Sequence, residues 1–577
     1  MQRRRFLQSL GVVAAISTSS KAAEVAATQE DQALARILIE KNDQRISQIL
    51  SDQLLEPDSP FVGGFPNPQL ICFVGSAAWN LCYLAAGWVS PDSRYFQSAH
   101  LEERMNLAID FLRRMQHDDG TIDLVSTNFH SPPDTGFTVE PIALALGIVR
   151  RHQLGRLTHF QKAAVEFLTS AGQALARGGI HTPNHRWVVC MALARIHQLL
   201  PDDRHVKRID QWLAEGIDID ADGQYAERST SVYTPLVNRC LLTVAKLLDR
   251  PELYDPVRRN LEMTRFLVRP NGEIVTEMSR RQDQSRRSLV DGYHYAYDFM
   301  ARMDSNGDFS AMVDWIEKLV GKENLHRRWL YRLEENSGVA PLPPARPLPT
   351  NYERHFPHSD IVRIRRGNVD ASIVANNSTL FALHRGAAVL QSLRLASAFF
   401  GKGQFQASTL DVPARSSEEA GQRAGGYRLT QQLTGPYVQP LAADLLPGDG
   451  DWSKMPLARR AQSEVQQLTT QITIREAAGR FKIHFVSLGT ARVPWAIELG
   501  FRAGGELSGV TPIDGIDDAY LVGEQGGSYR VGDDVIRFSS GPVQHRWTEL
   551  RGALPKLDAQ CVYLTGYTPL DFELTIG

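Results

Sequence analysis

The chain has 577 residues, 43% of them hydrophobic, and a formal net charge of −2 at pH 7. A chain of this length and composition can bury large cores, and at least two domains are expected. The near-neutral charge argues against nucleic acid as a partner, because nucleic-acid-binding domains carry a basic excess. Beyond the N-terminus, no segment has the roughly 18 uninterrupted apolar residues that a membrane helix needs.

The N-terminus has the pattern of an export signal. Three arginines at positions 3–5 precede an apolar run that ends at Ile16, and small residues follow. This predicts a bacterial signal peptide over residues 1–27, of the twin-arginine kind that exports folded proteins. A cut after Ala23 would remove these arginines and Lys21, so the formal charge of −2 would become −6. We therefore expect a periplasmic or secreted protein without membrane contact, which must hold any acidic substrate with a local basic cluster.

The cysteines and histidines give little sign of a metal or disulfide framework. The five cysteines are odd in number, lie mostly in apolar helical patterns and show no C-x-x-C spacing, which is typical of buried small hydrophobic residues. His355, His358 and Asp360 are metal-ligand residue types without a familiar metal spacing. We expect that no cofactor is required, and a structural divalent metal at this cluster remains an alternative.

Residues 70–320 show helical spacing in which apolar helices alternate with charged ones. This alternation predicts a repeated αα-hairpin with inner and outer helices. The inner helices are expected to begin near Gly75, Gly136, Pro183, Ser231 and Ser288, and the outer helices to lie near 100–115, 159–175, 205–214, 252–266 and 308–320.

Glycine turns precede four of the inner helices, at 117–122, 178–180, 221–225 and 270–274. Asp-Gly and Asn-Gly form tight turns because glycine accepts positive φ. Since the chain runs the same way in every hairpin, these loops should share one end of an (α/α) toroid. Helix N-termini would converge there and favour a carboxylate-bearing ligand. An open superhelical repeat for protein binding explains the hairpins equally well, but not the polar and aromatic residues in the loops.

The second half is expected to be rich in β-strands. A proline-rich segment at 338–349 predicts a linker between a toroid domain at 28–337 and an antiparallel β-sandwich at 350–577. Short β-rich runs separated by glycine turns support the sandwich. One helix is expected near 386–400.

Polar residues gather at the starts of two neighbouring inner helices. Thr182 is the expected N-cap and Pro183 the first helical residue, so Asn184 and His185 lie in the first turn. About 48 residues later, Tyr233 occupies the equivalent start of the next inner helix. The repeat length therefore predicts that Asn184, His185 and Tyr233 face one another.

These motifs resemble those of the heparinase II/III-like and related toroid alginate lyases. The resemblance rests on Asn184-His185, on the loop 222–225 with Glu227, and on Tyr233. It implies β-elimination at a uronate, in which the C5 proton is removed and the C4 oxygen is expelled. By this resemblance, Asn184 and His185 would donate hydrogen bonds to the uronate carboxylate, and Tyr233 would act as base, acid or both.

The resemblance also implies a histidine from the sandwich domain. His384 is the best candidate, and Tyr293 and His294 compete for the same role. Arg186 and Arg228 could clamp a carboxylate with a bidentate guanidinium, or they could be solvated surface residues. Some relatives hold zinc in the sandwich. The residues expected to contact substrate are His130, Glu140, Arg186, Tyr225, Arg228, Tyr293 and His294.

Two other functions remain open from the residues alone. A toroid glycoside hydrolase acting on uronyl oligosaccharides would need two carboxylic residues about the glycosidic bond. Asp134, Glu140, Glu227 and Asp291 are available for that role. The other alternative is a non-catalytic glycan-binding export protein. An acidic polysaccharide or oligosaccharide is the expected partner in each case.

Overall fold

The computed structural model describes residues 29–152, 155–335, 341–412 and 426–577. The chain forms two compact units: a helical unit (residues up to 265, with 289–348) and a strand unit (266–288 with 349–577). The predicted signal peptide, residues 1–27, lies outside the described residues. Within the described ranges, no helix has the length and apolarity needed to cross a membrane.

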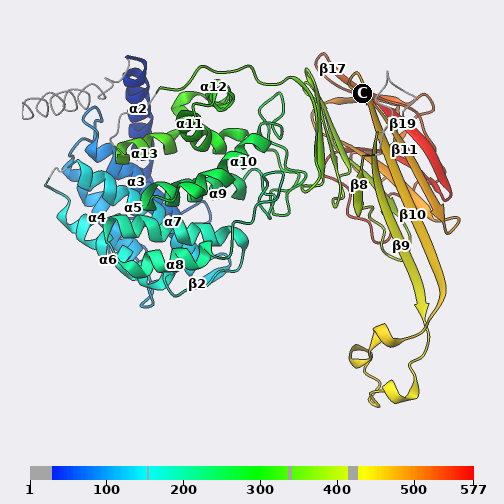
Figure 1. Cartoon of the computed structure of the whole chain (residues 1–577), viewed down its shortest axis with the longest axis horizontal. Helices are drawn as coiled ribbons and strands as arrows, with labels where there is room; N and C mark the ends of the chain where they lie inside the picture. The colour runs from blue at the N-terminus through cyan, green and yellow to red at the C-terminus, as the bar shows by residue number, and fades with distance from the viewer. Residues whose placement is uncertain (1–28, 153–154, 336–340, 413–425) are drawn as a thin grey trace, which may run out of the picture. The chain divides into compact units, whose positions relative to one another are not determined.

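The helical unit is built from hairpins in which apolar inner helices pack side by side, as predicted (Figure 1). Local sequence explains the helix starts: the Ser131 side chain accepts a hydrogen bond from the Asp134 backbone at one of them, and Pro183 begins another. The inner helices are α3 (Val74–Val89), α5 (Pro132–Arg151), α7 (Pro183–Leu199), α9 (Tyr233–Leu248) and α11 (His294–Met303).

Each of these inner helices is followed by a more amphipathic outer helix close to its predicted position. The outer helices are α4 (Ala99–Arg114), α6 (Thr158–Leu175), α8 (Asp203–Leu213), α10 (Tyr254–Thr264) and α12 (Gly307–Val320). The structure adds elements that the sequence analysis did not predict: α2 (Gln29–Asp52), α13 (His326–Glu335), β1 (Ile122–Leu124), β2 (Asn128–Ser131), η1 (Pro251–Leu253), η2 (Val290–Tyr293) and η3 (Lys322–Asn324).

Three of the four glycine turns take the expected backbone conformation. Gly120, Gly223 and Gly272 have φ of +86°, +103° and +85°, whereas Gly178 and Gly179 do not have positive φ. A Cβ at Gly223 would lie 2.5 Å from the backbone oxygen of Arg259, so a side chain does not fit there. The turns at Gly120 and Gly223 precede α5 and α9, which places the N-termini of the inner helices at the loop-bearing end.

The strand unit is an antiparallel β-sandwich with one parallel strand pair, β15 (Ala519–Val522) with β18 (Gln560–Tyr567). Its core contains Ile373 and Leu383 from one sheet and Ile472 and Phe485 from the other. The prediction of a helix near 386–400 is wrong, because Ala388–Ser397 forms strand β7. A short, nearly continuous apolar run does not distinguish a buried strand from a helix by periodicity.

The two sheets have eight and nine strands. The eight-stranded sheet has the order β13 (Glu506–Ser508), β16 (Gly527–Val531), β17 (Asp534–Phe538), β19 (Leu570–Ile576), β11 (Arg480–Gly489), β10 (Gln462–Ala477), β9 (Tyr427–Val438) and β8 (Thr409–Asp411). The nine-stranded sheet has the order β14 (Val510–Pro512), β15 (Ala519–Val522), β18 (Gln560–Tyr567), β12 (Pro494–Phe501), β7, β6 (Phe381–Arg385), β5 (Val369–Val374), β4 (Ile361–Arg366) and β3 (Asn351–Phe356).

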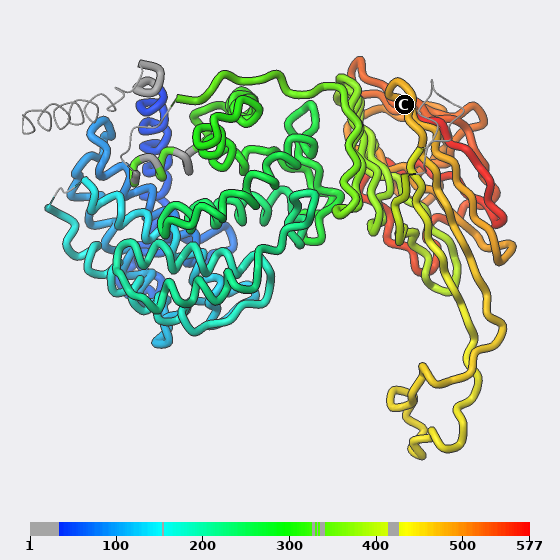
Figure 2. The backbone as a smooth tube through the Cα atoms, in the orientation of Figure 1, coloured from blue at the N-terminus to red at the C-terminus, as the bar shows by residue number. Residues whose placement is uncertain are grey.

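Two features of the strand unit lie outside the sandwich layers. The β9–β10 ribbon, drawn in yellow in Figure 2, runs past the sheet and carries residues 439–461, where the 3-10 turns η4 (Ala443–Leu445), η5 (Trp452–Lys454) and η6 (Leu457–Arg459) occur. Residues 341–349, in the predicted linker, have no helix or strand.

Residues 266–288 belong to the strand unit, whereas the predicted domain boundary placed them in the toroid. Polar contacts hold this segment: Arg363 Nε donates to the Phe266 backbone oxygen at 3.0 Å, and Arg502 forms a bidentate ion pair with Glu273 at 3.0 and 2.9 Å. The partners are distant in sequence, so periodicity could not assign the segment to this unit.

Buried charges join the inner helices of the helical unit. Glu140 on α5 receives a bidentate guanidinium from Arg239 on α9, at 3.0 and 3.2 Å, and also the hydroxyl of Tyr331 on α13. Arg195 on α7 pairs with Glu334 on α13 at 3.0 Å. These side chains connect four helices inside the unit.

Replacing Glu140 by alanine is expected to lower the free energy of unfolding by about 3–5 kcal/mol, because Arg239 keeps a buried charge without its partner. Urea denaturation followed by circular dichroism measures this loss. Glu103→Ala, at an exposed site of α4, is the control and should change stability by no more than about 0.5 kcal/mol. Equal effects of the two substitutions would contradict the importance of the pair.

Candidate functional site

The first turn of α7 holds Asn184 in a fixed orientation. Asn184 is 1% exposed, and its Nδ2 donates to Glu227 Oε2 at 2.8 Å and to Thr182 Oγ1 at 3.2 Å. Because a carboxylate only accepts hydrogen bonds, Glu227 determines which side of the amide faces it. Thr182 is the N-cap residue, but its side chain does not cap the helix backbone. Its hydroxyl accepts from Asn184 instead.

His185 follows Asn184 in the same turn and lies among aromatic rings. Its ring meets His181 edge-on at a centroid distance of 4.7 Å, and Phe137 of α5 edge-on at 6.1 Å. His185 is 8% exposed. The start of α7 is therefore in contact with α5 through His185 and with the turn before α9 through Asn184.

Tyr233 begins α9 and is partly exposed. Its backbone N–H donates to Ser229 Oγ at 3.1 Å, which orders the turn between Glu227 and the helix. Tyr293 Oη donates to the Thr230 backbone oxygen at 2.6 Å and attaches the same turn to the start of α11. The segment 227–233 thus carries both the partner of Asn184 and the tyrosine predicted for proton transfer.

Arg186 and Tyr225, predicted as substrate contacts, both have partners within the fold. The Arg186 guanidinium pairs with Glu215 at 3.3 Å and Asp218 at 2.9 Å. Tyr225 is 2% exposed, and its hydroxyl donates to Asn238 Oδ1 at 2.9 Å. Burial raises the pKa of Tyr225 well above its ordinary value, so this hydroxyl stays protonated.

Glu140 and Tyr293, also predicted as substrate contacts, are buried. Glu140 is enclosed with Arg239 and Tyr331, and Tyr293 is 1% exposed with its hydroxyl directed to the backbone of Thr230. His294 is buried too, with Nε2 3.1 Å from Glu317 Oε1. It nevertheless lines the pocket described below.

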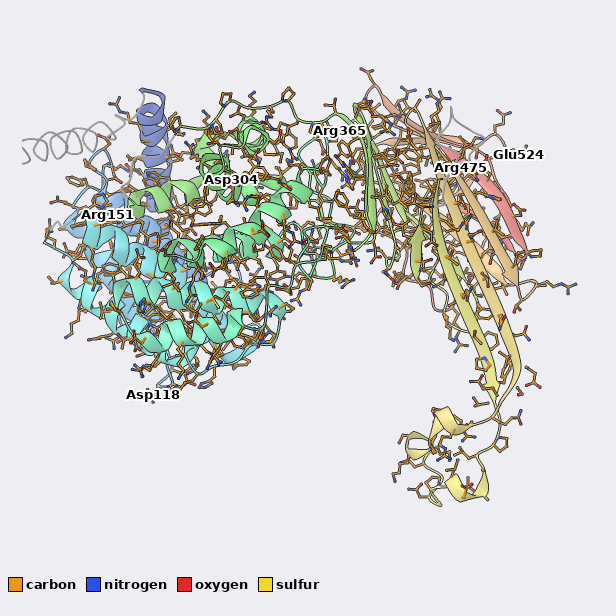
Figure 3. All side chains as sticks on the ribbon, in the orientation of Figure 1. Asp118, Arg151, Asp304, Arg365, Arg475 and Glu524 are labelled. Carbon is orange, nitrogen blue, oxygen red and sulfur yellow. The ribbon has the colours of Figure 1, made fainter. Side chains whose placement is uncertain are left out.

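His130 and Arg228 lie elsewhere around the loops. His130, on β2, stacks on His117 at 3.9 Å, and its Nδ1 lies 2.8 Å from Asp119 Oδ2. This hairpin is at the surface, as the exposed neighbour Asp118 shows in Figure 3. Arg228 is 8% exposed and has a φ of +51°, in the segment between Glu227 and Tyr233. Both residues retain their predicted role as substrate contacts as a hypothesis.

In the strand unit, His384 is 3% exposed and lies opposite Asp370 of β5. Burial, and then the charges of Arg269, Arg502 and Arg363, push its pKa well below the ordinary value of 6.5. Its Nδ1 has no hydrogen-bond partner among the described residues. The imidazole is therefore neutral at pH 7, and protonating it among these arginines is unfavourable.

A pocket of about 380 Å³ lies in the helical unit. It is lined by Tyr83 of α3, Arg239 of α9, Asp291 and Tyr295 near the start of α11, and Tyr331 of α13. Sequence analysis did not single out Tyr83, Arg239, Tyr295 or Tyr331. For Tyr83, Arg239 and Tyr295, the available signal was a charged or phenolic residue inside an inner helix.

Metal and paired-carboxylate sites were also considered in the sequence. Across the described part of the chain, no group of three or more His, Cys, Asp or Glu side chains is arranged to hold a metal ion. Among the hydrolase candidates, Glu140 is paired with Arg239, Glu227 accepts from Asn184, and Asp134 accepts from Asn128 at 2.9 Å. Asp291 is exposed and lines the pocket.

Glu227→Ala is expected to lower the free energy of unfolding by about 1–3 kcal/mol, because the buried Asn184 amide loses its acceptor. Glu227→Gln is the matched control, since its side-chain oxygen still accepts, and it should cost less. Denaturant unfolding of both variants tests this. If Gln is as destabilising as Ala, the hydrogen bond does not hold Asn184.

His384 should make stability depend on pH. Its folded pKa is below the unfolded value, so the unfolded chain binds a proton first as the pH falls. Above about pH 6.5 the imidazole is neutral in both states and does not change the free energy of unfolding. Below that pH the free energy of unfolding falls by up to about 1.4 kcal/mol for each pH unit, down to the folded pKa. Thermal unfolding of the wild type and His384→Gln between pH 7.5 and 5 should show a shallower loss in the variant. If the stabilities of the two proteins fall in parallel with pH, the lowered pKa of His384 does not contribute to the pH dependence.

No protein-family model and no curated protein matches this chain. Among solved structures, chondroitin AC lyase of Streptomyces coelicolor A3, in complex with chondroitin sulphate, has a TM-score of 0.52 and 13% identity, over 94% of this chain and 79% of its own. A Paenibacillus xanthan lyase has a TM-score of 0.52 and 10% identity, over 93% of this chain and 56% of its own. The fold of this chain, a helical toroid followed by a β-sandwich, is therefore one that it shares with these two lyases.

Proposed function

We propose that this chain is an exported polysaccharide lyase that cleaves a uronic-acid-containing glycan by β-elimination. The shared fold supports a glycan lyase. The observation that carries the proposal is the first turn of α7, where Asn184, oriented by Glu227, and His185 lie together at a helix N-terminus. The predicted signal peptide supports export to the periplasm or the medium.

The first chemical demand is acidification of the uronate C5 proton. This proton is removed only when the adjacent carboxylate is neutralised by hydrogen-bond donors. The His185 side chain, at the positive end of the α7 helix dipole, can supply such a donor. Asn184 joins it by exchanging its longer bond, 3.2 Å to Thr182, for one to the substrate, while Glu227 keeps the amide in place.

The second demand is proton transfer on both sides of the eliminated bond. The C5–H electron pair forms the C4–C5 double bond. The C4–O bond breaks, and the oxygen leaves with the electrons of that bond. Tyr233 takes the C5 proton, returns one to the departing oxygen, or does both. The role of His384 is a hypothesis that rests on the family resemblance alone, because its lowered pKa makes the imidazole a weak base. Arg228 and His130 are the candidates for contacts to the polymer.

The test is ultraviolet absorbance of a newly formed unsaturated uronate when the purified protein meets a panel of uronic-acid polysaccharides and oligosaccharides. We expect a rise for at least one substrate, and a loss of at least about 100-fold in kcat for Tyr233→Phe and His185→Ala. Tyr254→Phe, on the outer helix α10, is the matched control and should retain the activity.

Other outcomes assign the chain to a different class. New reducing ends without the absorbance rise would indicate hydrolysis and direct attention to Asp291. Binding of the glycan without any turnover, unchanged in Tyr233→Phe, would indicate a binding protein. Either result would overturn the lyase proposal.

A further inference from the structure

A second pocket of the helical unit lies between the outer helices α6 and α8, which are neighbours in Figure 1. Its volume is about 300 Å³. The two helices approach closely here, because an added Cβ at Gly172 would lie 2.7 Å from His205 Nε2. Among the described residues, the lining contains no aspartate or glutamate but four cationic side chains, Arg177, Arg204, Lys207 and Arg208. We call this site the basic pocket.

The two arginines that α8 contributes to the basic pocket differ in their partners. Arg204 pairs with Asp202 at 2.6 Å, which compensates its charge. Arg208 donates to neutral acceptors instead, the Gly178 backbone oxygen at 2.7 Å and Gln211 Oε1 at 3.0 Å. A neutral acceptor orients a guanidinium but does not cancel its charge. Arg208 is therefore a fixed positive charge on the pocket wall.

The other two cations are exposed and keep their charges uncompensated. Arg177 Nε donates to the Gln173 backbone oxygen at 3.2 Å, and in the described part of the chain neither Arg177 nor Lys207 forms an ion pair. Asp210, one turn after Lys207 on α8, pairs with Arg250 at 2.8 Å. Three uncompensated positive charges thus meet in one pocket of a chain whose net charge is −2. Such a local concentration of charge attracts anions even where the overall field does not.

The buried histidine of the basic pocket is the second sign of a ligand. His205 is 5% exposed, and its Nδ1 has no hydrogen-bond partner among the described residues. A buried polar atom in this condition is uncommon in a folded protein. A neutral imidazole carries one N–H donor, which an anion can accept. The pocket therefore combines cations at its edge with an unused polar ring inside it.

The basic pocket is distinct from the candidate functional site but borders the segment that leads to it. The Gly178 oxygen that binds Arg208 belongs to the turn 178–180, and α7 begins three residues later at Pro183. None of the residues that line the basic pocket was assigned to proton transfer or to the uronate carboxylate. A ligand held here lies outside the first turn of α7.

We propose that the basic pocket between α6 and α8 is a second binding site for an acidic glycan, in which Arg177, Lys207 and Arg208 hold one carboxylate or sulfate group of the polymer. The anionic character of the ligand follows from the pocket, whereas its identity as a glycan rests on the proposed lyase function. Guanidinium and ammonium groups bind such oxyanions through charge-assisted hydrogen bonds. The site retains the polymer beside the turn before α7 and takes no part in bond cleavage.

The experiment measures Kd by calorimetry for dextran sulfate, polygalacturonate and uncharged dextran, with the full-length mature protein carrying Tyr233→Phe to prevent turnover. Adding Arg177→Ala and Lys207→Ala removes the two exposed cations. We expect the Kd for at least one charged polymer to rise at least about tenfold, and the polymer affected identifies a sulfate or a carboxylate ligand. Uncharged dextran should not bind.

The matched control adds Lys162→Ala and Lys318→Ala, which remove two exposed lysines of the outer helices α6 and α12. It should leave every Kd unchanged. An equal loss of affinity in this control, or no loss for either charged polymer in the Arg177 and Lys207 variant, overturns the site. Inorganic sulfate is titrated as well. If it binds the basic pocket as tightly as dextran sulfate does, the ligand is a small free oxyanion and the glycan assignment is wrong.

Turnover is followed separately by the absorbance rise in proteins that keep Tyr233. The Arg177 and Lys207 substitutions should leave kcat unchanged. Turnover without any change in polymer affinity overturns the basic pocket and keeps the lyase. Dextran sulfate contains no uronate, so a loss of its binding in the variant supports the basic pocket even if no substrate is turned over and the lyase proposal fails.

Discussion

The ion pair between Glu140 and Arg239 is the interaction on which the helical unit most depends. These residues lie on α5 and α9, which are separated in the ring by α7, so the pair crosses the interior and does not merely join neighbours. Burying two charges is costly, and it is compensated only by good geometry and further hydrogen bonds. The bidentate contact and the Tyr331 hydroxyl supply both. The pair therefore favours one curvature of the ring over an open, extended stack of hairpins.

This curvature has consequences at the loop-bearing end. It brings the first turns of α7, α9 and α11 together, where two hydrogen bonds join neighbours: Asn184 to Glu227, and Tyr293 to Thr230. Arg239 has a second effect, because it borders the pocket while its charge is compensated by Glu140. One buried pair thus joins α5 to α9 and also compensates the charge of Arg239 beside the pocket.

Much of the fold could be predicted from the chain, because it depends on repeated local patterns. The starts of the inner helices followed from apolar periodicity, and Pro183 marked the first residue of α7 as expected. Short strands could be located but β7 could not be distinguished from a helix, since both its faces are largely buried. That residues 266–288 belong to the strand unit could not be predicted from the sequence either, because the contact between Glu273 and Arg502 joins positions 229 apart.

The contacts of the candidate site residues could not be predicted from the chain, because a position near a helix start does not say what the side chain contacts. Asn184, Arg186 and Tyr225 are all polar residues near the loops. They differ in which side chains they contact. Glu227 orients Asn184, whereas Glu215 and Asp218 neutralise Arg186 and Asn238 anchors Tyr225. A group whose hydrogen bonds are all formed within the fold has few donors or acceptors available for a substrate. What distinguishes a candidate site residue is thus a replaceable contact, such as the 3.2 Å bond of Asn184 to Thr182, beside a contact that holds it in place.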